Sequence, residues 1–426
     1  MLPLVRKSSL FFHRDFRQLW TGDSISQVGS AVTVLALPYL AIRGLHASPF
    51  QVALLTMFQY LAFLLIGLPA GAWVDRMRHR RVMIVGDLGR AVLLGSIPLA
   101  YAFHELSLLQ LYVVTFGTSV LTLFFDVAYQ SLLPALVDGE QLVDGNAKLE
   151  ATRNVAQVGG PGLGGVVINV LSAPAAIAVD AVSFLFSALF LARIRKVELK
   201  PEPRPDSNLR AEIAEGLRFV FGNRILRAIA TTAAISNLCG TIGISLLMVL
   251  LADKLHLSAF LCGLVFCAAA LGGIVGALAT ERVVARLGEG PAIWICMIVS
   301  TLCWFGALPL YQADWRLAIA ITLHGLGWVT LIIFNITQVS FRQRVTPKPL
   351  LGRMNATIRF VVWGSMPIGA LIGGVLGQTI GVRPAMWIGV TGELLAVLPV
   401  LLSPIRGMRE LPASLDSDES DAAVAA

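Results

Sequence analysis

The sequence predicts an all-α membrane protein with twelve transmembrane helices in two six-helix pseudo-repeats, and three observations support this. The chain of 426 residues is 56% hydrophobic and 14% charged, whereas a soluble domain has about 25% charged residues. Apolar runs long enough to cross about 30 Å of hydrocarbon as a helix recur along the chain. Short stretches of the first half also recur in the second.

The predicted spans follow one another with mostly short connections. They cover residues 19–42, 50–74, 82–103, 107–130, 149–171, 174–194, 226–251, 260–281, 291–311, 315–338, 356–379 and 384–403. The fifth and eleventh spans contain many glycines, so hydropathy identifies them less strongly than the others.

Basic residues fall on alternate sides of the predicted membrane. The N-terminal tail, the connections after the second and tenth spans, and the segment after the sixth are rich in Arg and Lys. The connections after the first, third, fifth and ninth spans hold one basic residue or none. Because basic residues are retained in the cytoplasm, we expect both termini there. The net charge of +7 then reflects topology and contact with anionic lipid rather than nucleic-acid binding.

No cofactor or metal motif is present in the sequence. A phosphate loop of the form G-x-x-x-x-G-K-[ST] is absent, so we do not expect ATP hydrolysis. The five cysteines lie in predicted spans of the second half, without metal-ligand spacing, and their odd number argues against a disulfide framework. We therefore expect packing cysteines, no metal and no cofactor.

The internal repeat is visible without gaps. At an offset of 210, Ile25-Ser26 aligns with Ile235-Ser236, Leu45-His46 with Leu255-His256, and Arg76 with Arg286. At an offset of 209, Asn146-Ala147 aligns with Asn355-Ala356, Gly160 with Gly369, and Gly164-Gly165 with Gly373-Gly374. Two halves in the same orientation follow, because six spans are an even number.

A polar linker separates the two halves. The run PEPRP contains three prolines, which preclude a continuous helix. Apolar residues at helical spacing after it predict an amphipathic helix on the cytoplasmic face. The predicted organisation is a first half over 1–194, a linker over 195–224, a second half over 225–404 and a disordered acidic tail over 405–426.

Four stretches together resemble the major facilitator superfamily. FRQLWTGDSISQVGS begins the first span, GAWVDRMRHRR follows the second, FFDVAYQSLLPALV ends the fourth, and GGPGLGG and DAVSFLFSAL lie in the fifth and sixth. More narrowly, the chain looks like the bacterial efflux branch that includes macrolide-type and enterobactin-type exporters. The resemblance covers nearly the whole chain and implies a transporter rather than an enzyme.

GAWVDRMRHRR resembles the cytoplasmic loop signature of this superfamily. The resemblance implies that Asp75 sits at the start of the eleventh span, near Asn355, and clamps the two halves together. A carboxylate is favourable beside arginine and at a helix N-terminus. Arg80 and Arg76 would link Asp75 to Asp126. The alternative is that the arginines only retain the loop in the cytoplasm.

Two positions of this loop bear on that choice. Topology alone does not require Gly71 and Asp75 four residues apart, and this separation favours the clamp. The family usually has glycine where this chain has Arg78. If that position needs a positive φ, arginine is strained there.

GGPGLGG in the fifth span has a packing and a functional interpretation. Gly160 and Gly164 lie one turn apart and allow another helix to approach closely, while Pro161 permits a bend. With Gly165, these residues form a Gly-Pro-x-x-Gly-Gly motif. This motif is similar to the family's signature for exporters that exchange cargo against protons. Packing alone is the alternative, since glycine contacts are common in membrane proteins. The resemblance favours proton-coupled efflux.

Ionisable residues inside spans are candidates for binding the coupling proton, because they are costly in hydrocarbon. The resemblance implies that spans one, four, seven and ten line a central cavity and that the sixth and twelfth are outer supports. Asp180 and Glu393 on the supports therefore rank lower. The proton-coupling candidates are Asp23, Asp126 and His324.

Each of these three residues also has an interpretation other than proton coupling. Asp23 is the leading proton carrier, because burial disfavours an ionised carboxylate; its alternative is an ion pair with Arg17 or Arg153. Asp126 fits the clamp better than proton transfer. His324 titrates in the right range but would pack equally well as a neutral side chain.

Uncharged polar and aromatic residues recur on the spans expected to line the cavity. Such a lining suits an amphipathic or lipophilic organic molecule better than an inorganic anion, although ordinary helix packing is the alternative at each position. The substrate-cavity candidates are Gln27, Ser30, Phe58, Tyr60, Ser119, Asn237, Trp328, Asn335 and Trp363.

The sequence thus predicts a monomeric secondary transporter in a bacterial cytoplasmic membrane, with the lipid bilayer, a small-molecule substrate and protons as its partners. It would export a drug or natural product by proton antiport and alternating access. A dedicated siderophore or metabolite exporter is one alternative. A transport-inactive sensor or scaffold with the same fold is another, which the intact GGPGLGG disfavours.

Overall fold

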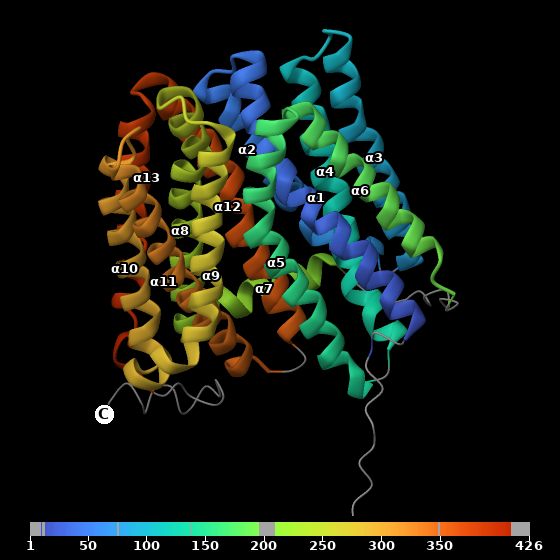
Figure 1. The fold of residues 1–426 in the computed structure, drawn as a ribbon. Coiled ribbons are helices and arrows are strands. Elements are labelled where there is room, and N and C mark those ends of the chain that lie inside the picture. The colour runs from blue at the N-terminus through green and yellow to red at the C-terminus, as the bar shows by residue number, and fades with distance from the viewer. Residues whose placement is uncertain are drawn as a thin grey trace, which may run out of the picture. The chain divides into compact units, whose positions relative to one another are not determined.

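The computed structural model describes Leu10 and residues 13–74, 76–137, 139–195, 209–347 and 350–409. The regular elements among these residues are all helices (Figure 1). The chain divides into two compact units, Met1–Leu37 with Pro69–Pro205 and Pro38–Leu68 with Asp206–Ala426. The predicted halves would instead keep 38–68 with the first half, and those domain boundaries stay a prediction.

Each predicted span coincides with a long helix or a helix pair. The first six are α1 (Arg14–Leu45), α2 (Pro49–Val74), α3 (His79–Ala102), α4 (Leu108–Leu136), α5 (Gly139–Val170) and α6 (Ala173–Ala192). The last six are α8 (Arg224–Met248) with a π-helical end (Val249–Lys254), α9 (Ala259–Leu287), α10 (Glu289–Leu310), α11 (Arg316–Val345), α12 (Leu351–Thr379), and α13 (Val382–Leu395) with α14 (Leu398–Leu401). A short 3₁₀ helix, Pro404–Gly407, follows.

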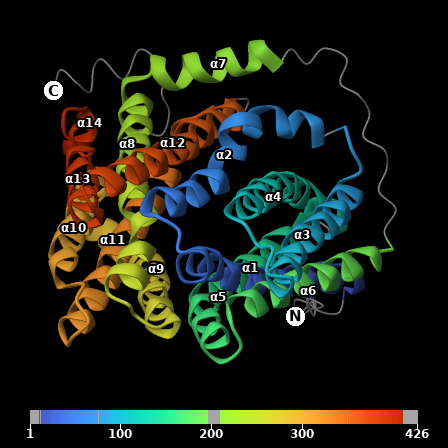
Figure 2. The ribbon, with the colours of Figure 1, turned by 90° about the horizontal axis from the view of Figure 1, so that it is seen from above.

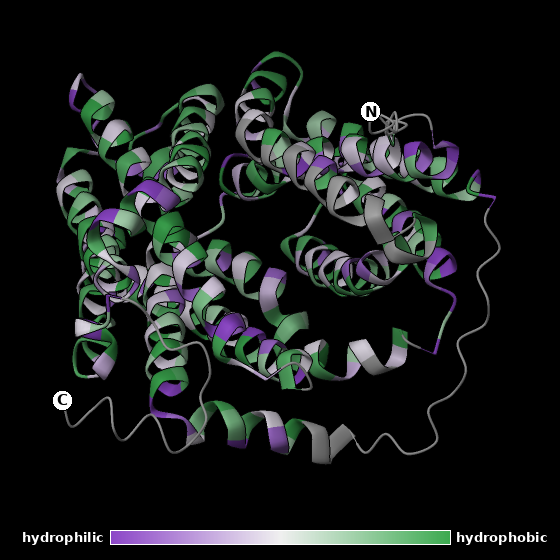
Figure 3. Ribbon diagram, turned by 90° about the horizontal axis from the view of Figure 1, so that it is seen from below, coloured by the Kyte–Doolittle hydropathy of each residue, from purple (hydrophilic) through white to green (hydrophobic). Residues whose placement is uncertain are grey.

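Among the described residues, 11 helices are long and apolar enough to cross a membrane. The predicted span outside this set is α5, whose N-terminal part carries charged residues and whose later part is diluted by glycine. Hydrophobic residues make up much of the helices in both units (Figure 3). The predicted all-α membrane fold is confirmed.

Polar caps define where several helices begin. The side chains of Ser107, Ser172 and Asn223 accept backbone N–H groups at the starts of α4, α6 and α8. These N–H groups have no partner within their own helix, and in a membrane protein an unsatisfied backbone donor is especially costly.

In the first unit, α3 packs against both α4 and α6 (Figure 2). In the second unit, α8 packs against α12 and α13, and α11 packs against α9 and α10. Apolar residues of α8, α10, α11 and α12 form a continuous core there, including Leu226, Ile293, Phe341 and Met354. Each unit therefore holds its polar candidates on a rigid helical framework.

The predicted amphipathic linker helix is α7 (Leu209–Gly222), which packs against the second unit at α12. A Cβ at Gly216 would lie 3.0 Å from the carbonyl oxygen of Arg353, so the two helices approach closely there. Arg353 also pairs with Glu215 on α7. The linker helix is thus attached to α12 by packing and by charge.

Candidate functional site

Asp23 is buried in α1, with 2% of its surface exposed. Gln27 donates from Nε2 to Asp23 Oδ1 at 3.2 Å. The second oxygen, Oδ2, is buried without a hydrogen-bond partner in the described part of the chain. Arg153 of α5, Asp126 of α4 and Arg90 of α3 interact with the carboxylate electrostatically. A carboxylate this deep is stable as an anion only beside compensating charge.

A buried ion pair on α3 interacts with Asp23 and is absent from the sequence-based candidates. Arg90 donates from Nη2 to Asp87 Oδ1, and their side chains are 7% and 0% exposed. The guanidinium also lies over two aromatic rings, 4.4 Å from the centroid of Phe125 and 4.2 Å from that of Phe184. The signal was present in the sequence, because DLGR places an acid and a base one turn apart inside an apolar span.

These groups form one electrostatic cluster in the first unit, which we call the α1–α3 charge cluster: Asp23, Asp87, Asp126, Arg90 and Arg153. Asp87 interacts with both Arg90 and Asp23, and Asp23 interacts with the other three. The named groups comprise three carboxylates and two guanidinium groups, and Asp180 on α6 also interacts with Arg90 and Asp87. Acids therefore outnumber bases among these described residues.

Asp180 on α6 is satisfied by a neighbouring helix. Thr33 of α1 donates from Oγ1 to Asp180 Oδ2 at 2.5 Å, and Ser183 Oγ lies 3.1 Å from Oδ1. Gly29 makes room for this contact, since a Cβ there would lie 2.5 Å from Ser183 Oγ. This environment is the one expected of an acid on a supporting helix.

Gly160 and Gly164 place α5 directly against α1. A Cβ at Gly160 would overlap the Cβ of Ala31, and one at Gly164 would lie 3.2 Å from the Cα of Val32. Pro161 lies inside α5, and Gly165 is buried. The predicted close helix approach is therefore present, whereas a role of this motif in antiport stays a prediction.

The second unit repeats this contact between α12 and α8. A Cβ at Gly369 would overlap the carbonyl of Leu238, and one at Gly373 would lie 3.0 Å from the Cα of Ile242. Ile242 is the residue 210 positions after Val32, the partner of Gly164. The sequence repeat thus corresponds to a repeated helix contact.

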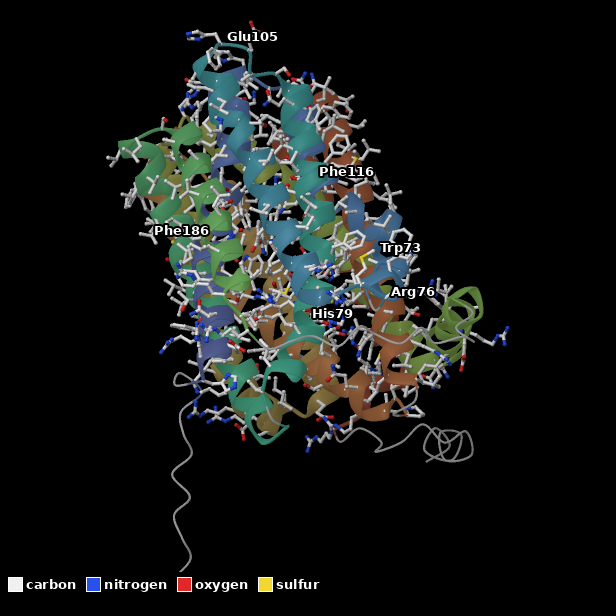
Figure 4. All side chains as sticks on the ribbon, turned by 90° about the vertical axis from the view of Figure 1, so that its right-hand side faces the viewer. Trp73, Arg76, His79, Glu105, Phe116 and Phe186 are labelled. Atoms are coloured by element: carbon white, nitrogen blue, oxygen red, sulfur yellow. The ribbon has the colours of Figure 1, made fainter. Side chains whose placement is uncertain are left out.

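The predicted clamp is described in part, because Asp75 lies outside the described residues. Arg76 is exposed near one end of the first unit, where Figure 4 also shows Trp73 and His79, with Glu105 at the opposite end. Arg80 donates from Nε to the carbonyl oxygen of Leu191 at 2.9 Å and from Nη2 to that of Ala192. Arg80 therefore caps the C-terminal end of α6, where a cation is favourable.

The remaining loop positions show no strain. Arg78 precedes α3 with a φ of −77°, so replacing the family's glycine by arginine costs nothing in the backbone. A Cβ at Gly71 would meet no atom within 4 Å. Asn355 is half-buried on α12 in the second unit. A clamp formed by Asp75 and Asn355 stays a prediction.

His324 on α11 is packed against α10 in the second unit. It is 1% exposed, and its Nδ1 lies 2.8 Å from the hydroxyl of Tyr311. Its ring lies edge-on to Trp304, with 4.4 Å between centroids. Such a neighbourhood favours the packing interpretation over proton transfer.

The substrate-cavity candidates have varied surroundings. Asn237 donates to the carbonyl of Ala233 in its own helix at 2.9 Å. Trp363 packs edge-on against Phe63, with centroids 4.7 Å apart, and the guanidinium of Arg359 lies 5.2 Å from its centroid. Ser119 is buried, and Gln27 bonds to Asp23. The partly exposed candidates are Ser30, Phe58, Tyr60, Trp328 and Asn335. Their role in binding cargo stays a prediction.

Comparison with known proteins places these helices and motifs in a family. The model of the family described as transmembrane secretion effector matches residues 8–424. The chain belongs to this family of the major facilitator superfamily. It is 24% identical to the enterobactin exporter EntS of Shigella dysenteriae over 98% of this chain and 99% of that one. It is 25% identical to the multidrug efflux pump Tap of Mycolicibacterium fortuitum, over 89% and 93%.

Solved structures show the same fold for this major facilitator protein. A bacterial homologue of the iron transporter ferroportin, in an inward-facing state, matches with a TM-score of 0.75 at 18% identity, covering 92% of this chain and 98% of that one. A bacterial homologue of the human lysosomal transporter Spinster matches with a TM-score of 0.70 at 13% identity, over 91% and 96%. The family match and the 11 apolar helices together make the chain a multi-pass membrane transporter.

Proposed function

We propose that this transporter exports a small amphipathic organic compound from the bacterial cytoplasm in exchange for protons. The observation that carries the proposal is the buried carboxylate of Asp23 in the α1–α3 charge cluster, whose Oδ2 has no hydrogen-bond partner among the described residues. An uncompensated charge in a helical membrane bundle is costly, and a proton removes it.

In this mechanism Asp23 accepts the proton. Asp87 is bonded directly to Arg90, whereas among the described side chains the Asp23 carboxylate is hydrogen-bonded to Gln27 alone, so we assign the proton to Asp23. Protonation removes the charge of the Asp23 carboxylate and lets the helices around it move without carrying that charge through hydrocarbon. Loss of the proton to the cytoplasm restores the charge and resets the cycle.

The cargo class rests on two kinds of support. The candidate lining residues offer uncharged hydrogen-bonding groups and aromatic rings, which suit an amphipathic organic molecule. The relatives named as an enterobactin exporter and a multidrug efflux pump support efflux of organic compounds.

The test uses Asp23→Asn in proteoliposomes with a pH jump. A panel of compounds is first screened in a host that lacks its major pumps and expresses the wild-type chain. This screen identifies a transported compound. We expect the imposed proton gradient to drive wild-type transport, and Asp23→Asn to abolish the response to the gradient while still binding the compound. Asp314→Asn is the matched control, because Asp314 is an exposed acid whose side chain contacts Arg316 alone among the described residues. Gradient-driven transport by Asp23→Asn equal to that of the wild type would refute Asp23 as the carrier.

The same compound panel distinguishes a multidrug exporter from an exporter of a single compound. A multidrug exporter would lower accumulation of several unrelated compounds, whereas a dedicated exporter would act on one natural product and give no drug phenotype. Binding of a compound without any flux would instead favour a sensor.

A further inference from the structure

A cavity of about 480 Å³ opens in the second unit where three helices end on the same side. It lies where α9 ends, α10 begins and α11 ends, and its charged lining consists of Arg286, Arg344, Arg409 and Glu289. Since these helices cross the membrane, the cavity lies at the level of the lipid headgroups, on the side that basic residues predict to be cytoplasmic.

The charges around this cavity are only partly compensated. Arg344 Nη2 pairs with Glu289 Oε1 at 2.6 Å. The other oxygen, Glu289 Oε2, is buried and has no hydrogen-bond partner within the described ranges. Arg286 and Arg409 are exposed, and neither side chain forms an ion pair with a described residue. With respect to the described residues, the cavity therefore presents two positive charges without an ion-pair partner and one acceptor without a donor.

Backbone contacts build the wall that carries Arg409. Glu289 N donates to the carbonyl of Arg409 at 3.2 Å, and Gly290 N donates to that of Met408 at 3.0 Å. Gly288 has a φ of +88°, and a Cβ there would lie 2.9 Å from the Cα of Arg409. Two glycines and two hydrogen bonds thus hold this segment against the start of α10.

A second cavity of about 530 Å³ continues from the first along α9 and α11. The two share Val284, Ala285, Glu289 and Arg344. From there the groove reaches Ala277, seven residues or roughly 10 Å further along α9. Alanine, valine, isoleucine and threonine line this part together with Ser340 and Glu281, and Ala277 is exposed.

We propose that this pair of cavities binds an anionic phospholipid with a hydroxyl-bearing headgroup, such as phosphatidylglycerol. The phosphate binds Arg286 and Arg409, a headgroup hydroxyl donates to Glu289 Oε2, and the start of one acyl chain lies along the groove to Ala277. Glu281 also lines the groove, and its negative charge repels a phosphate from that part of it. The phosphate is therefore placed at Arg286 and Arg409.

Charge selects this lipid over the others. Two uncompensated arginines attract a headgroup with a net negative charge and repel the ammonium of phosphatidylethanolamine or phosphatidylcholine. A free phosphate would use the arginines alone and gain nothing from the groove. The acyl-chain groove is therefore what distinguishes a lipid site from a soluble-anion site.

The test is native mass spectrometry of the full chain released from nanodiscs that contain phosphatidylglycerol and phosphatidylcholine in equal amounts. We expect wild-type protein to retain phosphatidylglycerol, and Arg286→Gln and Arg409→Gln each to reduce retention about fivefold, as loss of one basic contact near the surface implies. Arg282→Gln is the matched control, an exposed arginine of the same helix that lines neither cavity. Ala277→Trp fills the groove and should also reduce retention, with every arginine intact.

Several results would overturn the proposal. Equal loss in Arg282→Gln would mean that general surface charge attracts the lipid. Retention of phosphatidylethanolamine equal to that of phosphatidylglycerol, in nanodiscs of matched content, would exclude a charge-selective site. Thermal stabilisation by inorganic phosphate equal to that by phosphatidylglycerol would point to a soluble anion. Size-exclusion profiles matching the wild type show that each variant is folded, and lipid retention is measured without any transport.

Discussion

Asp87 and Arg90 on α3 form a buried ion pair, so each charge is stabilised by the other. Asp87 is fully buried, and Arg90 is held by this carboxylate and by the faces of Phe125 and Phe184. Aromatic faces stabilise a cation without adding negative charge. Arg90 is therefore held in place by more than its ion pair, while Asp87 depends mainly on Arg90.

We expect Arg90→Gln to lower the free energy of unfolding by about 3 kcal/mol, since it leaves Asp87 as an uncompensated buried charge. The double variant Asp87→Asn with Arg90→Gln removes both charges and should recover at least half of that loss. Thermal unfolding of purified protein in one detergent measures both. Arg193→Gln, an exposed arginine near Phe190, is the control and should change stability by less than about 0.5 kcal/mol. A double variant as unstable as the single one would contradict the assignment.

His46 and His256 occupy equivalent helix ends in the repeat. Both have a φ of 51°, which non-glycine residues adopt at a cost. After each histidine, a backbone N–H reaches back six residues, from Ala47 to Ala41 and from Leu257 to Leu251. The left-handed backbone of the two histidines is the conformation that glycine adopts at helix ends.

His46→Gly should therefore stabilise the protein by about 0.5–1 kcal/mol, because glycine adopts this conformation without steric cost. His46→Ala removes the same side chain but keeps the strain, so it should not stabilise. Both variants are compared by thermal unfolding. Equal stabilisation by glycine and alanine would show that the imidazole, and not the backbone, is unfavourable.

At the scale of elements, adjacent glycines of α5 have different surroundings. A Cβ at Gly160 would overlap Ala31 on α1, whereas one at Gly159 would meet nothing within 4 Å. The helix contact therefore depends on one glycine and not on its neighbour. Close approach of this kind stabilises helix pairs in membranes by packing alone.

Gly160→Ala should destabilise the protein by roughly 1–3 kcal/mol, because the added methyl forces α5 away from α1. Gly159→Ala should leave stability unchanged or raise it slightly, since alanine is the better helix former. Thermal unfolding of the two variants side by side checks this, and Ala31→Gly combined with Gly160→Ala should restore stability. Equal effects of the two single variants would contradict the packing at Gly160.

At the scale of the whole molecule, orientation in the membrane is open to direct measurement. The basic connections predict that the loop after α3 is outside and that the segment after α14 is inside. A cysteine introduced at His104 should react with a membrane-impermeant maleimide in intact cells. One introduced at Arg406 should react only after permeabilisation, with the native chain as background control. The reverse pattern would overturn the predicted orientation.

The helices and the family could be predicted from the sequence because both depend on local patterns. Apolar length determines which segments enter the bilayer, and GGPGLGG and DAVSFLFSAL are contiguous motifs. Asp23 could be selected as a candidate because an acid inside an apolar run is costly wherever it packs. Its partners Arg90 and Asp126 lie on other helices, so their proximity could not be read from one span.

By itself, the sequence determined the membrane class, the helix order, the repeat and the family, since hydropathy and motif spacing are properties of the chain. The tertiary structure alone decided that Arg90 lies over Phe125 and Phe184, that His324 packs on Tyr311, that Arg80 caps α6, and that Arg286 and Arg409 share a cavity. Each of these depends on which faces of distant helices meet, and interhelical packing, rather than the spacing of residues along the chain, determines that.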